Sequence, residues 1–274
     1  MKKKLLSCLE WLKNVFSKKK IKAFLSDKKN RRSVITLCSV AVILIATVIF
    51  AVVYINDYYH VDGQALIEYT ESSANDININ IKTDKDDIIA VIPNEVKAGF
   101  IFYPGGKVEF NSYLPLMLEC AERGILCVLI KMPCNLAVLN ANAADGITED
   151  YPEVTEWYIG GHSLGGSMAA SYLSKHSDEI SGLILLGSYS TADVTDSRVL
   201  SIYGSEDGVM NREKYEKYSS NLPSNFTEII IDGGNHAYFG IYGKQDGDGS
   251  AKITQKEQIK LTAEYIANFI FDKD

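Results

Sequence analysis

The pattern of apolar and polar positions changes abruptly within the first quarter of the chain. Residues 34–55 form an apolar run of 22 residues without a charge. At about 1.5 Å per residue such a run crosses a hydrocarbon core about 30 Å thick. A cleavable signal peptide is the alternative, but its apolar region would span about 7 to 15 residues and end in small residues. The run has neither property, so we predict an uncleaved transmembrane helix.

Beyond residue 75 the chain alternates short apolar stretches with segments of helical periodicity. From the third stretch onward the strands are apolar on both faces and separated by helices, which predicts an α/β fold with a mostly parallel sheet and helices on both faces. The expected strands are 77–81, 88–92, 99–103, 125–130, 157–159, 183–186, 199–203 and 226–231, and the expected helices are 110–123, 137–150, 164–175, 212–221 and 254–271.

Charge separates the two ends of the chain. The first 33 residues carry 12 Lys and Arg against two acids, Glu10 and Asp27, which leaves 16 basic and 33 acidic residues for everything after them. The acidic part of the chain after residue 33 is expected to repel nucleic acid. The basic arm suits an anionic membrane surface, either as a short amphipathic helix or as a solvated tail. The positive-inside rule holds the N-terminus in the cytoplasm.

These patterns divide the chain into four parts. We expect a basic cytoplasmic arm over 1–33, a membrane helix over 34–55, a stalk with one helical turn over 56–75 and an extracytoplasmic α/β domain over 76–274. About 200 residues suffice for a sizeable core. The predicted protein is single-pass in the cell membrane, in contact with the lipid bilayer through 34–55.

One segment indicates nucleophilic catalysis. In IGGHSLGG, Gly161, Ser163 and Gly165 form a G-x-S-x-G motif between an apolar strand and a helix. This is the context of a nucleophile elbow, in which a tight strand-to-helix turn exposes the serine hydroxyl above the sheet edge. We therefore expect Ser163 to be the nucleophile.

A serine needs a base to take its proton. The chain has four histidines, of which His60 is next to the membrane, His162 is inside the motif and His176 is at the far end of the following helix. His236 follows the strand 226–231 and is left as the expected base.

An acid should orient that base and precede it along the chain. Asp207 follows the strand 199–203 and is our preferred acid, because that strand comes directly before the one that delivers His236. Glu206 and Asp232 remain open alternatives.

Acyl transfer also needs hydrogen-bond donors for the developing oxyanion. One should be the backbone N–H of Leu164, directly after the serine. The second should come from the loop YPGGKVE after the third strand, from the amide of Gly106 or of Lys107.

The remaining motifs do not indicate a metal or a cofactor. Five cysteines are present without a C-x-x-C pair, so we expect no metal site and no cofactor. Cys120, Cys127 and Cys134 are expected to pack as small apolar side chains, although one disulfide among them stays possible on sequence alone. The segment 246–249 lacks the spacing of a calcium loop and reads as a turn.

Taken together, these motifs resemble the α/β-hydrolase superfamily, and within it the compact lidless branch of dienelactone hydrolases and carboxylesterases. The resemblance runs from about residue 75 to the C-terminus and rests on YPGGKVE, KMPCNLAVL, IGGHSLGG, SIYGSEDGV and GGNHAYFGIYGKQDGDG. It implies an α/β-hydrolase fold with Ser163 as nucleophile, His236 as base and Asp207 as acid. Dienelactone hydrolases carry cysteine in the elbow, so their particular substrate is not carried over.

The expected function is the cleavage of carboxylic ester substrates through an acyl-enzyme, without a cofactor or a nucleic acid partner. The interval 187–198 is too short for the lid of a lipase, which favours small or soluble esters, or exposed acyl groups on a polymer. Two alternatives remain: an acyltransferase on cell-surface glycans or lipids, and a non-catalytic binding module with this fold.

Overall fold

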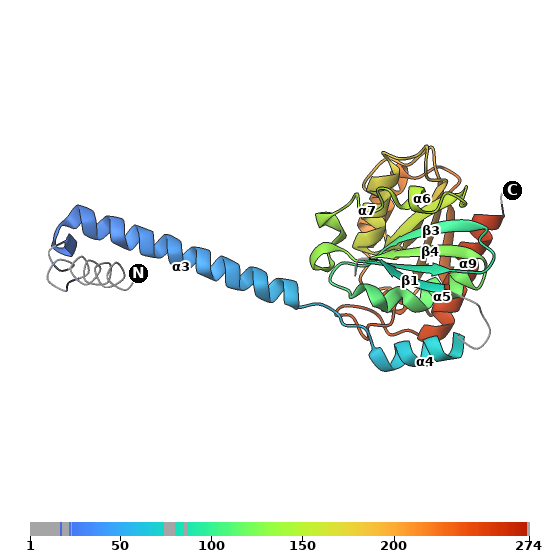
Figure 1. The fold of residues 1–274 in the computed structure, drawn as a ribbon, viewed down its shortest axis with the longest axis horizontal. Coiled ribbons are helices and arrows are strands. Elements are labelled where there is room, and N and C mark those ends of the chain that lie inside the picture. The colour runs from blue at the N-terminus through green and yellow to red at the C-terminus, as the bar shows by residue number, and fades with distance from the viewer. Residues whose placement is uncertain (1–16, 18–21, 23, 74–79, 85–86, 273–274) are drawn as a thin grey trace, which may run out of the picture. The chain divides into compact units, whose positions relative to one another are not determined.

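The structure is a computed structural model of the 274-residue chain. It describes residues 17, 22, 24–73, 80–84 and 87–272. Two compact units make up the chain, one ending at Asn56 and the other running from Asp57 to Asp274. The sheet and all candidate chemical residues belong to the second unit, whose helices and strands are labelled in Figure 1.

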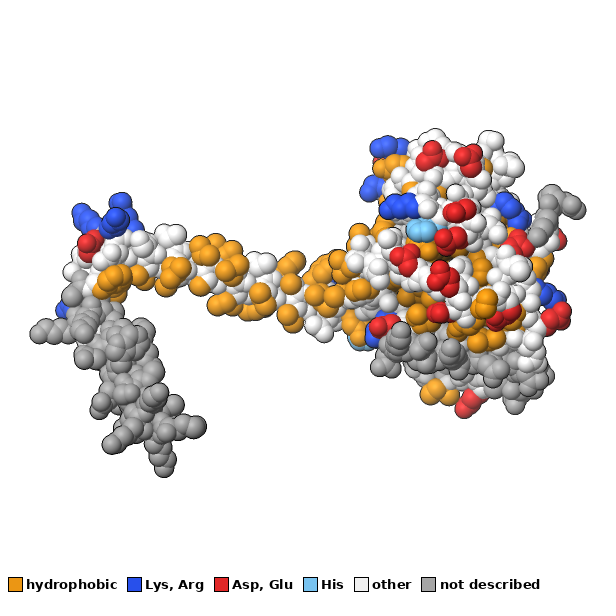
Figure 2. All heavy atoms as spheres, turned by 45° about the horizontal axis from the view of Figure 1, so that its top comes forward, with side chains coloured by type: hydrophobic (Ala, Val, Ile, Leu, Met, Phe, Trp, Pro, Cys, Tyr) orange, Lys and Arg blue, Asp and Glu red, His pale blue; other side chains and the backbone are white. Residues whose placement is uncertain are grey.

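The first unit contains one long helix, α3 (Lys28–Asn56), which includes the apolar run expected to span a membrane. None of its residues is buried, and Figure 2 shows apolar side chains along it, with Lys and Arg gathered near its start. Among the described residues, α3 is the one helix long and apolar enough to cross a membrane. It is therefore a candidate span, since an apolar helix with no buried residue matches a lipid environment.

The second unit opens with a helix longer than the single turn expected there. Helix α4 (Gly63–Ser73) has 11 residues. Its start is capped by Asp62, whose carboxylate accepts a hydrogen bond from the Ala65 amide at 3.1 Å. Tyr69 is buried and its hydroxyl donates to Glu119 at 2.9 Å. Packing against the body of the protein thus stabilises turns that the local pattern did not predict.

Eight strands form one sheet in the order β1-β2-β4-β3-β5-β6-β7-β8. Strand β2 pairs antiparallel with β1 and with β4, and all other neighbours are parallel. This confirms the α/β-hydrolase fold with a mostly parallel sheet. The strands are β1 (Asn80–Asp84), β2 (Ile88–Ile92), β3 (Ala98–Tyr103), β4 (Ile125–Ile130), β5 (Trp157–His162), β6 (Gly182–Leu186), β7 (Arg198–Gly204) and β8 (Thr227–Ile231).

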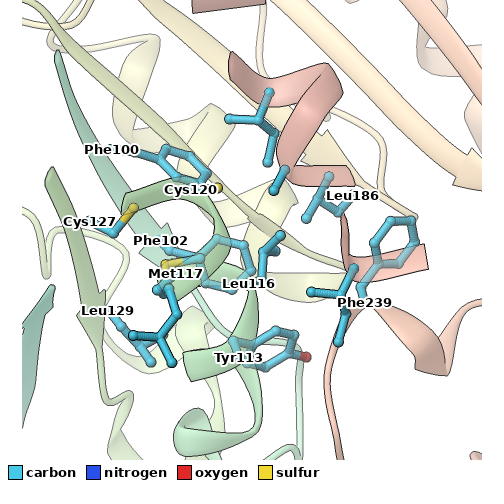
Figure 3. Packing of buried hydrophobic residues seen from close by; sticks show 14 of the residues in the cluster. Phe100, Phe102, Tyr113, Leu116, Met117, Cys120, Cys127, Leu129, Leu186 and Phe239 are labelled. Carbon is cyan, nitrogen blue, oxygen red and sulfur yellow. The ribbon is translucent and has the colours of Figure 1, made fainter. Parts of the chain in front are cut away.

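Helices cover both faces of the sheet. Because side chains alternate along a strand, Phe100 and Phe102 of β3 enter one core, whereas Ile101 and Tyr103 enter the other. Helices α5 (Leu114–Ala121) and α9 (Gln255–Phe271) pack on the first core, of which Figure 3 shows a part. The second core is covered by α6 (Ile147–Asp150) and α7 (Leu164–Leu173).

The remaining helix is α8 (Arg212–Tyr218), and short 3-10 turns lie in the loops. These turns are η1 (Phe110–Tyr113), η2 (Pro133–Asn135), η3 (Ala137–Leu139), η4 (Ser219–Asn221) and η5 (Ala237–Phe239). The helix expected over 110–123 is thus a 3-10 turn followed by α5. Strand β1 begins at Asn80, and residues 77–79 of its expected range lie outside the described residues.

The helix expected over 137–150 is wrong. The segment contains only η3, a series of turns and the four-residue α6. The buried Tyr103 hydroxyl donates to the Ala141 carbonyl at 3.0 Å and accepts from the Ala144 amide at 2.9 Å. Gly146 then has a positive φ of 80°, a left-handed conformation that interrupts a helix.

The cysteine expectation is correct for two residues. Cys120 and Cys127 are buried free thiols within the first core, whereas Cys134 is an exposed free thiol. The three described cysteines of this unit therefore form no disulfide. For Cys134 the packing expectation is wrong, because the loop of residues 133–139 turns that side chain toward solvent.

Candidate active site

Ser163 lies in a sharp turn between β5 and α7. Its φ of 52° and ψ of −121° lie outside the regions that non-glycine residues normally adopt. The Ser163 amide donates to the Leu186 carbonyl of the neighbouring strand at 2.9 Å. Strain of this kind persists only when the surroundings impose it, and it is the backbone signature of the nucleophile elbow expected from the sequence.

The glycines on both sides of Ser163 permit this turn. A Cβ on Gly161 would collide with the Tyr103 carbonyl oxygen, and a Cβ on Gly165 would collide with the carbonyl oxygens of Tyr103 and Pro104. The end of β5 and the start of α7 therefore approach the end of β3 more closely than any side chain allows. This steric requirement explains the G-x-S-x-G spacing in physical terms.

His236 and Asp207 form a buried pair at the carboxyl ends of β8 and β7. His236 Nδ1 lies 2.8 Å from Asp207 Oδ2, and the two side chains are 1% and 0% exposed. Since β7 and β8 are parallel neighbours, the loops that follow them meet at one edge of the sheet. The structure thus brings together the base and the preferred acid of the sequence analysis.

The alternative acids do not contact this histidine. Glu206 pairs instead with Lys252 at 2.7 Å, and Asp232 is exposed. Asp207 is further held through Oδ1, which accepts hydrogen bonds from the amides of Val209 at 2.9 Å and Met210 at 2.8 Å.

These contacts keep the Asp207 carboxylate ionised. Burial alone raises the pKa of Asp207, but the hydrogen bond and charge of His236 and the two amide donors outweigh burial, so the pKa lies below its ordinary value of 3.8. The pair therefore provides a fixed negative charge against one side of the imidazole.

The second ring nitrogen of His236 is available for chemistry. His236 Nε2 is buried and has no hydrogen-bond partner among the described residues, Ser163 included. The turn formed by Gly187 and Ser188 contacts both His236 and Ser163. A Cβ on Gly187 would lie 2.9 Å from His236 Nδ1. The Ser188 hydroxyl donates a hydrogen bond to the Ser163 carbonyl at 2.6 Å. The hydrogen bonds of a catalytic base often become short only in the complex with substrate.

Of the candidate oxyanion donors, the structure favours Gly106 and Leu164. Leu164 is the first residue of α7, so its amide has no partner within that helix. A Cβ on Gly106 would lie 3.0 Å from the Leu164 side chain, so this side chain packs against the Gly106 backbone. Lys107 donates its amide to the Asn135 carbonyl at 2.7 Å, whereas no described residue accepts from the Gly106 amide.

A buried network supports the loop of Gly106. The Tyr113 hydroxyl accepts a hydrogen bond from the Gly105 amide at 3.1 Å and lies 2.8 Å from His162 Nδ1. The rings of His162 and His236 lie 4.3 Å apart between centroids. Burial, followed by the nearby charge of His236, lowers the pKa of His162 well below its ordinary value of 6.5. His162 is therefore a neutral spacer between the loop and the candidate base.

Asp248 also contributes to the site, and sequence reasoning missed it. Its Oδ1 accepts from the amides of Gly208 and His236, both at 3.2 Å, and from that of Gly249 at 2.8 Å. Its Oδ2 accepts from Ala237 at 2.8 Å. The sequence predicts only a turn over 246–249, and its pair of Asp-Gly steps is the signal that points to Asp248.

A cavity of about 210 Å³ opens beside Ser163. Leu164, Gly187, Ser188 and Met210 contribute to its lining. A larger cavity of about 580 Å³ lies beside Arg198, at the opposite end of β7 from Asp207. The smaller cavity is therefore the candidate substrate pocket, because it adjoins the candidate nucleophile and the larger one does not.

Within the described part of the chain, no three His, Cys, Asp or Glu side chains gather as metal ligands would. The expectation of no metal and no cofactor stays a prediction.

A family model described as "Alpha/beta hydrolase family" matches residues 99–260. No curated protein matches the chain. Among solved structures, a dienelactone hydrolase from Anabaena variabilis has a TM-score of 0.54 at 14% identity, covering 70% of this chain and 99% of its own.

Two further structures are similar at the same level. A sugar hydrolase from Lactococcus lactis has a TM-score of 0.52 at 14% identity, with 72% of this chain and 98% of its own covered. A soluble variant of a monoglyceride lipase from Saccharomyces cerevisiae has a TM-score of 0.50 at 13% identity, with 72% and 95% covered. At such identities these likenesses concern the fold.

Proposed function

Because the chain belongs to the alpha/beta hydrolase family, we propose that it is a serine hydrolase that cleaves carboxylic esters through an acyl-enzyme. The observation that carries this proposal is the buried contact of 2.8 Å between His236 and Asp207 at the same sheet edge as the strained Ser163. An imidazole that is held on one side by a carboxylate, with its other nitrogen unpartnered, is the arrangement that activates a serine.

In the proposed reaction, Ser163 Oγ attacks the ester carbonyl while His236 Nε2 takes its proton. Asp207 holds the imidazole through Nδ1 and stabilises its positive charge. The amides of Leu164 and Gly106 donate to the oxyanion, and each such donor is worth about 3 kcal/mol of barrier. His236 then protonates the leaving alcohol, and a water molecule activated by the same ring releases the acid from Ser163.

We also propose that α3 anchors the enzyme in the cell membrane, with its N-terminus in the cytoplasm. Support comes from its length, from its lack of buried residues and from the 12 basic residues that precede residue 34. The catalytic unit would then lie outside the cytoplasm. Protease protection of the first 33 residues in sealed cells tests this topology.

The activity test combines a fluorophosphonate probe with a panel of p-nitrophenyl esters of increasing acyl length. Wild type should be labelled and should turn over at least one ester, whereas Ser163→Ala should not be labelled and should lose about 10³-fold or more in kcat. Ser171→Ala, in α7 away from the cavity lining, is the matched control. Equal turnover by wild type and Ser163→Ala would refute the proposal.

A further inference from the structure

The residues that directly follow α3 contact the loops that border the candidate site. The Tyr59 amide donates to the Lys107 carbonyl at 2.7 Å, and the Glu109 amide donates to the Tyr59 carbonyl at 2.9 Å. The two segments therefore pair like strands, as an isolated parallel bridge between Tyr59 and Val108. This pairing holds the loop that carries Gly106.

The same segment is also tied to the loop after His236. The Asp62 amide donates to the Ile241 carbonyl at 2.8 Å, and the Tyr59 hydroxyl accepts from the Asp246 amide at 3.1 Å. An ion pair of 2.7 Å joins Asp57 to Lys107. Residues 57–62, the juxtamembrane segment, are thus bound to both loops that border the candidate site.

Chain length limits how far this site lies from the membrane. Only Asp57 and Tyr58 separate Asn56, the last residue of α3, from Tyr59. Three residues span at most about 10 Å, which is close to the thickness of one headgroup layer. The segment that pairs with the loop of Gly106 therefore begins within three residues of the end of α3.

An exposed apolar pair lies on the neighbouring loop. Val138 and Leu139 are 56% and 58% exposed. Their loop is joined to the site through Asn135, whose carbonyl accepts from the Lys107 amide, and through Leu136, whose side chain approaches Gly106. No charged residue occurs between Lys131 and Asp145. Such a surface is suited to lipid, since charge would have to be desolvated there.

We propose that Val138 and Leu139 contact the membrane surface and that the substrate is a carboxylic ester of a membrane-resident amphiphile. This proposal rests on the proposed function and on α3 as a membrane span. Ser163 would attack an acyl carbonyl at headgroup level, the alcohol would leave with a proton from His236, and water would release a fatty acid. No lid is needed, because the anchor already holds the site at the surface.

The test uses the full chain in phosphatidylcholine vesicles that contain a minor fraction of phosphatidylglycerol. Two esters are compared: water-soluble p-nitrophenyl acetate and a fluorogenic long-chain monoacyl ester embedded in the same vesicles. The measured quantity is the ratio of embedded to soluble ester hydrolysis. The double variant Val138→Ser/Leu139→Ser should lower this ratio about ten-fold, because it removes two apolar contacts with lipid.

Ile230→Ser is the matched control, since Ile230 is 53% exposed on the edge strand β8 and outside the loop of residues 131–140. It should leave the ratio unchanged. Fluorophosphonate labelling reports whether each variant is folded. If the double variant is not folded, the same ratio is measured for the single variants Val138→Ser and Leu139→Ser.

The outcomes separate the two proposals. An unchanged ratio in the folded double variant, or wild-type hydrolysis of the soluble ester alone, overturns the membrane-substrate proposal and leaves the hydrolase intact. Wild type that hydrolyses neither ester and resists the probe overturns both.

Discussion

The carboxylate of Asp248 accepts a hydrogen bond from the backbone amide of His236, the candidate base, at 3.2 Å. The same oxygen accepts from Gly208, which directly follows Asp207. One side chain thus connects the loop of the base to the loop of the acid. It adds to the hydrogen bond that the Glu206 amide donates to the Gly234 carbonyl at 2.8 Å, so the two loops are joined both before and after the acid.

We expect Asp248→Asn to lower both stability and turnover. Asparagine keeps one acceptor oxygen and loses the negative charge, so at least one buried amide is left without a partner, at a cost of about 2 kcal/mol. Looser positioning of His236 should lower kcat by about ten-fold, a change of about 1.4 kcal/mol in the barrier, with a smaller effect on KM. Urea unfolding and steady-state kinetics measure the two effects.

Asp246→Asn is the control for this experiment. Asp246 lies in the same loop and is exposed, so its substitution should change neither quantity. Wild-type kcat in Asp248→Asn would show that the four hydrogen bonds do not position the base.

Substitution of the acid distinguishes Asp207 from its neighbour Glu206. Asp207→Asn should lower kcat by about 10⁴-fold, because the amide no longer holds the imidazole in the reactive tautomer. Glu206→Gln should have little effect, since Glu206 pairs with Lys252 at the surface. Steady-state kinetics on the same ester decide between them, and a larger loss in Glu206→Gln would contradict the assignment.

The buried His162 should make the protein less stable in mild acid. Its folded-state pKa lies well below the ordinary value of 6.5, so the unfolded chain binds a proton at a pH where the folded chain does not. The stability is therefore fully present above pH 6.5 and decreases as pH falls toward the folded pKa, by up to about 1.4 kcal/mol per pH unit.

Urea unfolding from pH 8 to pH 5 measures this slope. We expect His162→Gln to remove the contribution and His176→Gln, at a half-buried position three residues after the end of α7, to preserve it. An identical slope in wild type and His162→Gln would contradict the prediction.

Gly161→Ala should prevent the elbow from forming. The added Cβ would meet the backbone of Tyr103 and of Gly165, and backbone atoms cannot move aside as a flexible side chain can. We expect a loss of about 3 kcal/mol or more in unfolding free energy. The control is Gly63→Ala at the start of α4, where nothing lies within 4 Å of the added Cβ. Equal melting temperatures of the two variants would be inconsistent with this steric argument.

The juxtamembrane segment should decide where a soluble fragment can begin. A fragment starting at Asp57 keeps the pairing of Tyr59 with Lys107 and Glu109, and we expect it to hydrolyse soluble esters. A fragment starting at residue 76, the boundary expected from the sequence, loses that pairing and α4, so its melting temperature and kcat should be lower. Equal behaviour of both fragments would support the shorter domain.

The sequence by itself determined the features that depend on residues close together in the chain. The uncharged run of 34–55 specifies a membrane-spanning length, and the apolar stretches 88–92 and 125–130 coincide with β2 and β4. Motif spacing selected Ser163 as the candidate nucleophile, because only glycines fit the steric limits of that turn. These features depend on residues close together in the chain, so a linear pattern is enough to reveal them.

Contacts between distant segments decided the rest. The order of the strands favoured Asp207 over Glu206 and Asp232, but which carboxylate lies against His236 depends on the packing of two loops. The hydrogen bonds of Asp248 join loops separated by 40 residues at Gly208, and Tyr59 pairs with a segment 48 residues away at Lys107. Only the tertiary structure determines these hydrogen bonds, because their partners are distant in the sequence and come together only when the chain folds.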